Sequence, residues 1–190
     1  MKLRNGFVSN SSSSSFVVVF PREPKSCKDV QDILFDKNRT IYASVTTNYN
    51  TKEKIDFTTA QAALTVWNDI KRQKRRKNQI KIAKKVIRSG YIDDPNSPDL
   101  QDFIDHKAST IPADFHDRFK RYNQAQCDFA DTIFNERIIG RKMKLKTINN
   151  EPIEEQIYTF GYSDEDGSYG SALEHNGLFK KLRHVRISHH

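Results

Sequence analysis

The stretch Phe16-Val17-Val18-Val19-Phe20 decides the fold. It is a run of five apolar residues of the types that favour strands, preceded by the serines at 11–15 and ended by Pro21. An apolar run with such polar and proline bounds predicts a buried β-strand. The serines before it favour turns and extended chain over a helix interior, so they are expected to form an extended lead-in to the strand.

Alternation of apolar and polar residues predicts further strands elsewhere in the chain. They are expected at residues 40–46, 141–148, 156–162 and 184–187. The second and third of these are a plausible hairpin with a longish loop. Strands are therefore expected near both ends of the sequence.

Helical periodicity and capping residues predict helices between the strands. Ser26 begins a short helix that ends near Asp36. Thr58 or Thr59 begins a second, with its apolar face at Ala62, Ala63, Val66, Trp67 and Ile70. That face vanishes from residue 71 to 79 and then resumes as Ile80, Ala83, Val86 and Ile87. The stretch is therefore two helices, or one long helix with a projecting polar middle, and it ends at Gly90.

Three more helices are expected toward the C-terminus, at residues 97–104, 112–140 and 173–179. The one that Pro112 opens is amphipathic and rich in aromatic residues. Together the elements predict an α+β fold in which central helices, including a basic one, pack against strands from both termini. The clearest linker, Asp93 to Pro98, divides the chain into residues 1–98 and 99–190, which form two halves or one compact domain.

The composition is that of a folded protein with a polar surface. The chain has 190 residues, of which 36% are hydrophobic and 29% charged, and its 12 Phe and 7 Tyr supply bulky core material. Its two cysteines, Cys27 and Cys127, form no disulfide framework and are expected to be packed thiols in a reducing compartment. Neither a secretory signal nor a membrane-spanning run is visible, so a cytoplasmic location is expected.

Positive charge is concentrated in the first half of the chain. The net charge is +8, but residues 1–98 carry 19 basic and 9 acidic side chains, whereas 99–190 carry 13 and 15. The densest part is residues 71–88, with ten Lys or Arg and no acid: Lys71, Arg72, Lys74, Arg75, Arg76, Lys77, Lys81, Lys84, Lys85 and Arg88. Such a run attracts polyanions, and contact with nucleic-acid phosphates is the leading interpretation. An acidic protein partner and a merely solvated helix face are the alternatives.

Two further features are weaker candidates for binding sites. The hydroxyls and amides of Ser9 to Ser15 could hold a phosphate, although glycine-rich phosphate loops follow a strand and precede a helix. The acidic stretch Asp164 to Asp166 before Gly167 resembles part of a calcium loop without its full pattern, and a solvated hairpin tip is the preferred interpretation.

Histidines gather near the C-terminus. Four of the six are His175, His184, His189 and His190, with several carboxylates nearby in the sequence. Imidazole and carboxylate together can bind zinc or another transition metal, which could activate water for hydrolysis. Their spacing matches no metal motif, so a structural or exposed role is preferred and no cofactor is predicted.

The two ends of the chain have distinctive sequences, RNGFVSNSSSSSF at residues 4–16 and LRHVRISHH at 182–190. Both resemble the ends of a group of small bacteriophage proteins. This resemblance implies a phage accessory protein acting in a bacterial cytoplasm, and it implies no particular chemistry. The leading hypothesis is therefore a non-enzymatic accessory protein that binds nucleic acid or a ribonucleoprotein through a basic helical surface. An inhibitor or adaptor that docks on a host protein is the first alternative, and a metal-dependent hydrolase is the second.

Overall fold

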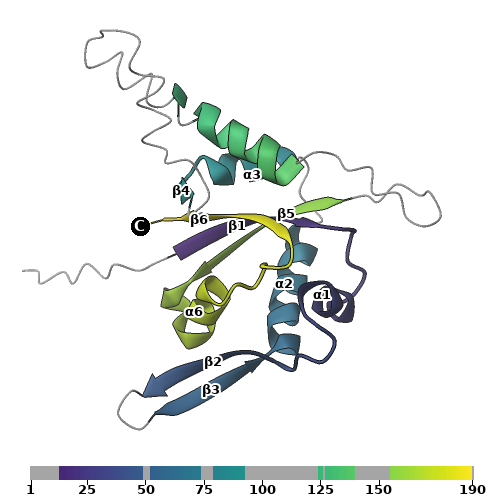
Figure 1. Cartoon of the computed structure of the whole chain (residues 1–190), viewed down its shortest axis with the longest axis vertical. Helices are drawn as coiled ribbons and strands as arrows, with labels where there is room; N and C mark the ends of the chain where they lie inside the picture. The colour runs from purple at the N-terminus through teal and green to yellow at the C-terminus, as the bar shows by residue number, and fades with distance from the viewer. Residues whose placement is uncertain are drawn as a thin grey trace, which may run out of the picture.

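The protein has an α+β fold (Figure 1). A computed structural model describes residues 13–48, 52–73, 79–92, 124–125, 127–139 and 155–189. The linker at 93–98, the helix expected at 97–104 and the strand expected at 141–148 lie outside these residues, as does the first part of the helix expected at 112–140. The two-domain division therefore stays a prediction.

The apolar run of residues 16–20 lies in the middle of the main sheet, in strand β1 (Ser13–Phe20). Four antiparallel strands follow the order β4-β6-β1-β5, with β4 at Tyr91–Ile92, β5 at Gln156–Ser163 and β6 at Arg183–Ser188. The strands expected at 156–162 and 184–187 are thereby confirmed. β1 begins earlier than expected because it is paired on both sides, so Ser13, Ser14 and Ser15 belong to the sheet and are not a lead-in to it.

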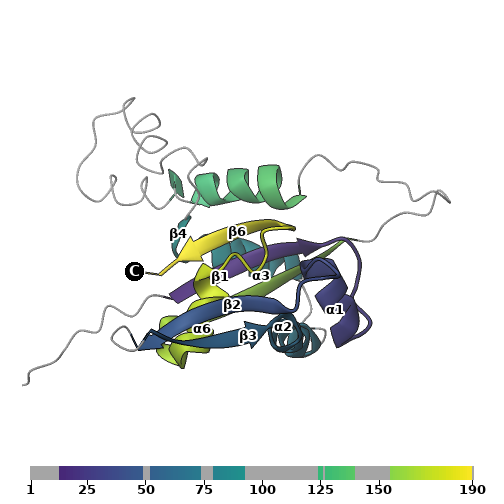
Figure 2. The same cartoon turned by 60° about the horizontal axis from the view of Figure 1, so that its bottom comes forward.

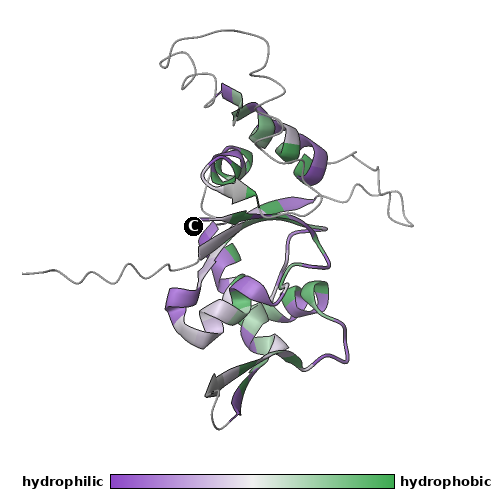
Figure 3. Ribbon diagram, turned by 60° about the vertical axis from the view of Figure 1, so that its left-hand side comes forward, coloured by the Kyte–Doolittle hydropathy of each residue, from purple (hydrophilic) through white to green (hydrophobic). Residues whose placement is uncertain are grey.

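Helices cover both faces of this sheet (Figure 2). One face packs against α1 (Cys27–Leu34), α2 (Thr59–Gln73) and α6 (Gly167–His175). The other face packs against α3 (Gln79–Ile87) and against residues 127–133, which are helical and continue as the π-helix η1 (Phe134–Ile139). Hydrophilic and hydrophobic residues alternate along these helices (Figure 3), as expected for elements with one buried face.

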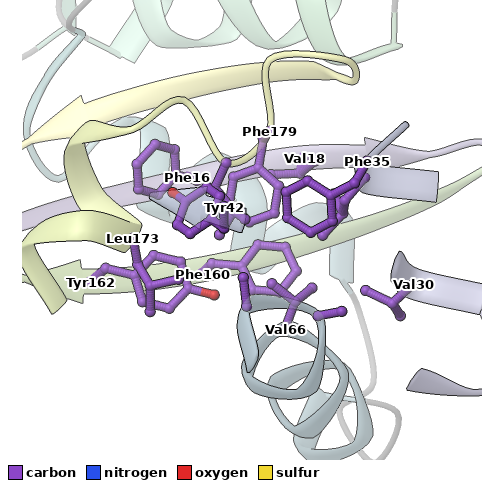
Figure 4. Close-up of a cluster of buried hydrophobic side chains, with 14 of the residues drawn as sticks. Phe16, Val18, Val30, Phe35, Tyr42, Val66, Phe160, Tyr162, Leu173 and Phe179 are labelled. Atoms are coloured by element: carbon purple, nitrogen blue, oxygen red, sulfur yellow. The ribbon is translucent and has the colours of Figure 1, made fainter. Parts of the chain in front are cut away.

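Alternate residues of β1 supply two separate cores. Phe16, Val18 and Phe20 point toward α1, α2 and α6, where aromatic rings from β1, β5 and the turn after α6 gather (Figure 4). Val17 and Val19 point toward α3 and η1. A strand with period-two side chains can serve two layers only if both sets are apolar, which is why the run is continuous rather than alternating.

The predicted helix starts at Ser26 and Thr58 are confirmed. The Ser26 hydroxyl accepts a hydrogen bond from the Asp29 amide. Thr58 and Gln61 form a reciprocal cap: the Gln61 amide donates to Thr58 Oγ1 at 3.2 Å, and the Thr58 amide donates to Gln61 Oε1 at 2.8 Å. These local bonds fix where α1 and α2 begin.

The structure contains a two-stranded ribbon that differs from the sequence-based expectation in two ways. β2 (Ile41–Asn48) confirms the strand at 40–46, but a register shift places Tyr42 and Ala43 both in the core. Its partner β3 (Glu53–Thr58) was not predicted from the sequence. Most β3 side chains are exposed, so the strand lacks the apolar signal that marks the others.

The segment before β6 also differs from expectation. Asp164 to Asp166 form a short 3₁₀-helix, η2, between β5 and α6, and not the tip of a hairpin. The helix expected at 173–179 is α6, which begins at Gly167 and ends at His175. Gly167, with φ of +77°, makes the turn between them, because this backbone region favours glycine.

Buried tyrosines make stability sensitive to alkaline pH. Burial raises the pKa of Tyr158 to about 12 and holds the pKa of Tyr162 well above its ordinary value of 10.0. The unfolded chain therefore releases these protons first, so the stability present below pH 10.0 falls as the pH rises further. We expect tyrosinate absorbance to appear together with loss of circular dichroism in an alkaline titration. Ionisation of all seven tyrosines near pH 10.0, with the fold intact, would contradict this.

Candidate nucleic-acid interface

The basic run is divided between two helices on opposite faces of the sheet. Lys71 and Arg72 are exposed at the end of α2, whereas Lys81, Lys84 and Lys85 lie on α3 and Arg88 directly follows it. α2 belongs to the Phe16 layer and α3 to the Val17 layer. A single continuous basic helix is therefore wrong, because α2 and α3 pack against opposite faces of the sheet. Lys74, Arg75, Arg76 and Lys77 lie outside the described residues.

Gln73, the last residue of α2, is hydrogen-bonded to β5. Its side-chain amide donates to the Thr159 carbonyl at 2.6 Å and accepts from the Thr159 amide at 2.9 Å. Among the described residues β5 is the last strand on its side of the sheet, and at Thr159 the Gln73 amide group takes the place of a neighbouring strand. Gln79 then donates to the Gln73 carbonyl at 2.9 Å. The end of α2 and the start of α3 are thus both held at the β5 edge.

Two pairs of basic residues on and just after α3 have different roles. Lys84 and Arg88 both contact Asp131, at 3.4 and 2.8 Å, and Lys84 also lies 5.3 Å from the centre of the Phe134 ring. This pair holds α3 against residues 127–139. Lys81 and Lys85, one helical turn apart, are exposed and contact no carboxylate among the described residues. They are the basic side chains of α3 that are available to a phosphate.

At the end of α2 the exposed charges are held by weak contacts. Lys71 Nζ lies 5.7 Å from the centre of the Trp67 ring, and Arg72 lies 3.4 Å from Asp69. Burial raises the pKa of the Asp69 carboxyl, while Arg72 and the Tyr162 hydroxyl act in the opposite direction. An exposed pair of this kind contributes about 0.2 to 1 kcal/mol, so a phosphate can compete for Arg72.

The three described histidines of the C-terminal group do not come together. His175 contacts Arg186 on the α6 side of the sheet. His189 contacts Ser15 at 2.9 Å, and Ser15 lies on the same side of β1 as Val17. His184 Nδ1 contacts the Leu182 carbonyl. Within the described part of the chain no three His, Cys, Asp or Glu side chains could hold a metal ion, and His190 lies outside it.

The serines of β1 take part in a buried polar network that the sequence pattern did not reveal. The Ser14 hydroxyl donates to Glu174 Oε1 at 2.8 Å and accepts from Arg186 Nε at 3.1 Å, and Arg186 lies 3.6 Å from the same carboxylate oxygen. The Glu174 side chain is fully buried. This Ser14–Glu174–Arg186 network joins α6 to β1 and β6. The Ser14 hydroxyl already makes two hydrogen bonds within the protein, one as donor and one as acceptor. The serines at 9–12 lie outside the described residues, and their phosphate-binding role stays a prediction.

The fold and this surface define an α+β protein with exposed basic side chains on both sides of one sheet edge. Comparison of the chain with protein-family models finds no match, and neither do comparisons with curated proteins and with solved structures. In the part of the chain that the structure describes, no helix is both long enough and apolar enough to cross a membrane.

Proposed function

We propose that this protein binds nucleic acid, alone or within a ribonucleoprotein, through the basic residues around the β5 edge. The observation that carries the proposal is the exposed pair Lys81 and Lys85 on α3, a helix without an acidic residue. Lys71 and Arg72 extend the same positive charge to the other side of the edge. The resemblance of both chain ends to bacteriophage proteins suggests an accessory protein acting in a bacterial cytoplasm.

Binding would proceed by neutralising phosphates and not by reading bases. Like charges one turn apart on a helix cost about 0.2 to 0.5 kcal/mol, and a phosphate between them removes that repulsion and releases counterions. Lysine side chains without a fixed planar geometry give little base specificity. The affinity is therefore expected to depend steeply on salt and weakly on sequence.

Charge reversal on α3 tests this function. We expect the double variant Lys81→Glu/Lys85→Glu to bind labelled duplex DNA and structured RNA much more weakly than the native chain. The slope of log affinity against log salt for duplex DNA should become shallower by roughly 0.9 for each phosphate that the variant no longer neutralises. A variant with Lys74, Arg75 and Arg76 changed to Glu extends the test to the part of the run outside the described residues.

The matched control is Lys37→Glu/Lys180→Glu. Both side chains are exposed, and they lie beside α1 and α6, on the face of the sheet opposite α3. This control changes the net charge by the same amount, so it should leave most of the affinity in place. Equal losses in both double variants would show that only net charge matters. Absence of binding at about physiological salt would end the proposal and leave an acidic host protein as the partner to seek.

A further inference from the structure

The ribbon of β2 and β3 ends in an open edge. Among the described residues it has only these two strands, and it projects away from the four-stranded sheet with β3 on its far side (Figures 1 and 2). An edge strand presents unpaired backbone groups that can pair with another strand. Which groups β3 presents follows from the hydrogen bonds at its end.

The outward-facing backbone groups of β3 belong to Lys54 and Asp56. At the end of the strand, the Thr59 amide donates across the ribbon to the Thr40 carbonyl at 2.8 Å, whereas the Thr58 amide donates to Gln61 in α2. Along an antiparallel strand, the backbone N–H and C=O groups of successive residues point alternately to one side of the strand and to the other. The groups of Ile55 and Phe57 therefore face β2, and those of Lys54 and Asp56 face away from it.

The side chains of the same strand have an apolar and a polar face. Phe57 packs against Tyr169, with ring centres 4.9 Å apart, and Ile55 lies on the same face opposite Val45. Ile55 is nevertheless 47% exposed, because this part of the ribbon extends beyond the core. Lys54 and Asp56 lie on the other face, both exposed, and Asp56 accepts a hydrogen bond from Ser44.

These features select one way for β3 to pair with itself. In a two-fold antiparallel pair, outward-facing residues must lie opposite outward-facing residues. A pair centred on Lys54 places two lysines opposite each other, and one centred on Asp56 places two aspartates opposite each other. A pair centred on Ile55 places each Lys54 opposite Asp56 of the second copy and brings the two exposed Ile55 side chains together. Opposite charges and apolar pairs across strands are stabilising, whereas like charges are not.

We propose that two copies of this chain associate through antiparallel pairing of their β3 strands, centred on Ile55. The two ribbons then form one four-stranded sheet, with Lys54 and Asp56 exchanging backbone hydrogen bonds and side-chain ion pairs across the two-fold axis. The α2 helix begins directly after β3 and Gln61 occupies the Thr58 amide, so the pairing is short. The dimer is accordingly weak and forms with rising concentration. This inference is independent of the proposed function.

Sedimentation velocity of the full chain over about 1 to 500 µM tests the dimer. The native chain should shift from monomer to dimer within that range. Lys54→Asp and Asp56→Lys should each raise the dissociation constant at least about tenfold, because each places like charges opposite one another. Mixing the two variants in equal amounts should restore the dimer, because every Asp then faces a Lys. The double variant Lys54→Asp/Asp56→Lys should also dimerise.

Controls separate pairing from folding. Ser44→Ala removes the hydrogen bond that Asp56→Lys also removes, but it keeps the charges, so its dimer should persist. Circular dichroism checks that each variant is folded. A native chain that stays monomeric up to the highest concentration would overturn the proposal. Single variants that dimerise normally, or a mixture that remains monomeric, would overturn the pairing centred on Ile55.

Discussion

Replacing Phe179 with alanine is expected to lower the free energy of unfolding by about 3 to 5 kcal/mol. The Phe179 side chain is 1% exposed, and its ring lies 4.8 Å from that of Phe160 and 5.4 Å from that of Phe16, measured between centres (Figure 4). Its removal leaves a cavity over the face of the sheet, above β1 and β5, and deprives several aromatic rings of their neighbour. Chemical denaturation followed by circular dichroism measures the loss.

The matched variant Phe179→Leu keeps most of the apolar volume. It should cost clearly less than the alanine variant, because the cavity left behind is small. If alanine and leucine had the same small effect, the aromatic cluster around Phe179 would not be the core of this layer. If both had the same large effect, the aromatic ring itself, and not the filled volume, would be what stabilises it.

Replacing Glu174 with alanine is expected to lower the free energy of unfolding by about 3 kcal/mol. The change leaves Arg186 without its carboxylate partner and removes the acceptor for the buried Ser14 hydroxyl. Removing one member of a buried pair costs more than the pair contributes, because the remaining group stays desolvated. Arg186 is 23% exposed and can still reach water, which keeps the loss near the lower end of the range for buried pairs.

Further variants separate the contribution of the Glu174 charge from that of Arg186. Glu174→Gln keeps one oxygen acceptor for Ser14, replaces the other oxygen with an NH2 group and loses the charge, so it should cost less than the alanine variant. A cycle of Glu174→Ala, Arg186→Ala and the double variant should show a coupling of about 0.5 to 3 kcal/mol. Additive losses would mean that the Glu174 carboxylate stabilises the fold independently of Arg186. A loss of less than about 0.5 kcal/mol for Glu174→Ala would show that the network does not hold α6 to the sheet.

The division of the basic run changes what can be expected of a phosphate-binding surface. As a sequence it is one block of like charge, but Lys84 and Arg88 are engaged with Asp131, which lies in the half of the chain with a slight negative charge. Lys81 and Lys85, on the same helix, remain exposed. The charge density of the sequence therefore overstates the number of basic side chains available to a phosphate, because some of them form ion pairs that hold the fold together.

The amino-acid sequence by itself determined the elements whose causes are local. The apolar run at 16–20, the cap at Ser26 and the reciprocal cap of Thr58 and Gln61 each act within a few residues, so their pattern is visible in the chain. The α+β class followed from the same signals. β3 was missed because a strand with exposed, charged side chains on one face carries little of that local signal.

Only the tertiary structure decided which distant residues meet. Ser14 and Glu174 are separated by 160 positions, and Gln73 and Thr159 by 86, so no local periodicity relates them. β1 extends back into the serines because β5 and β6 pair with it on both sides. The faces on which the described basic residues lie are set by the packing of α2 against one side of the sheet and of α3 against the other. These arrangements depend on long-range pairing and burial, which act between elements and leave no mark on the pattern within any one of them.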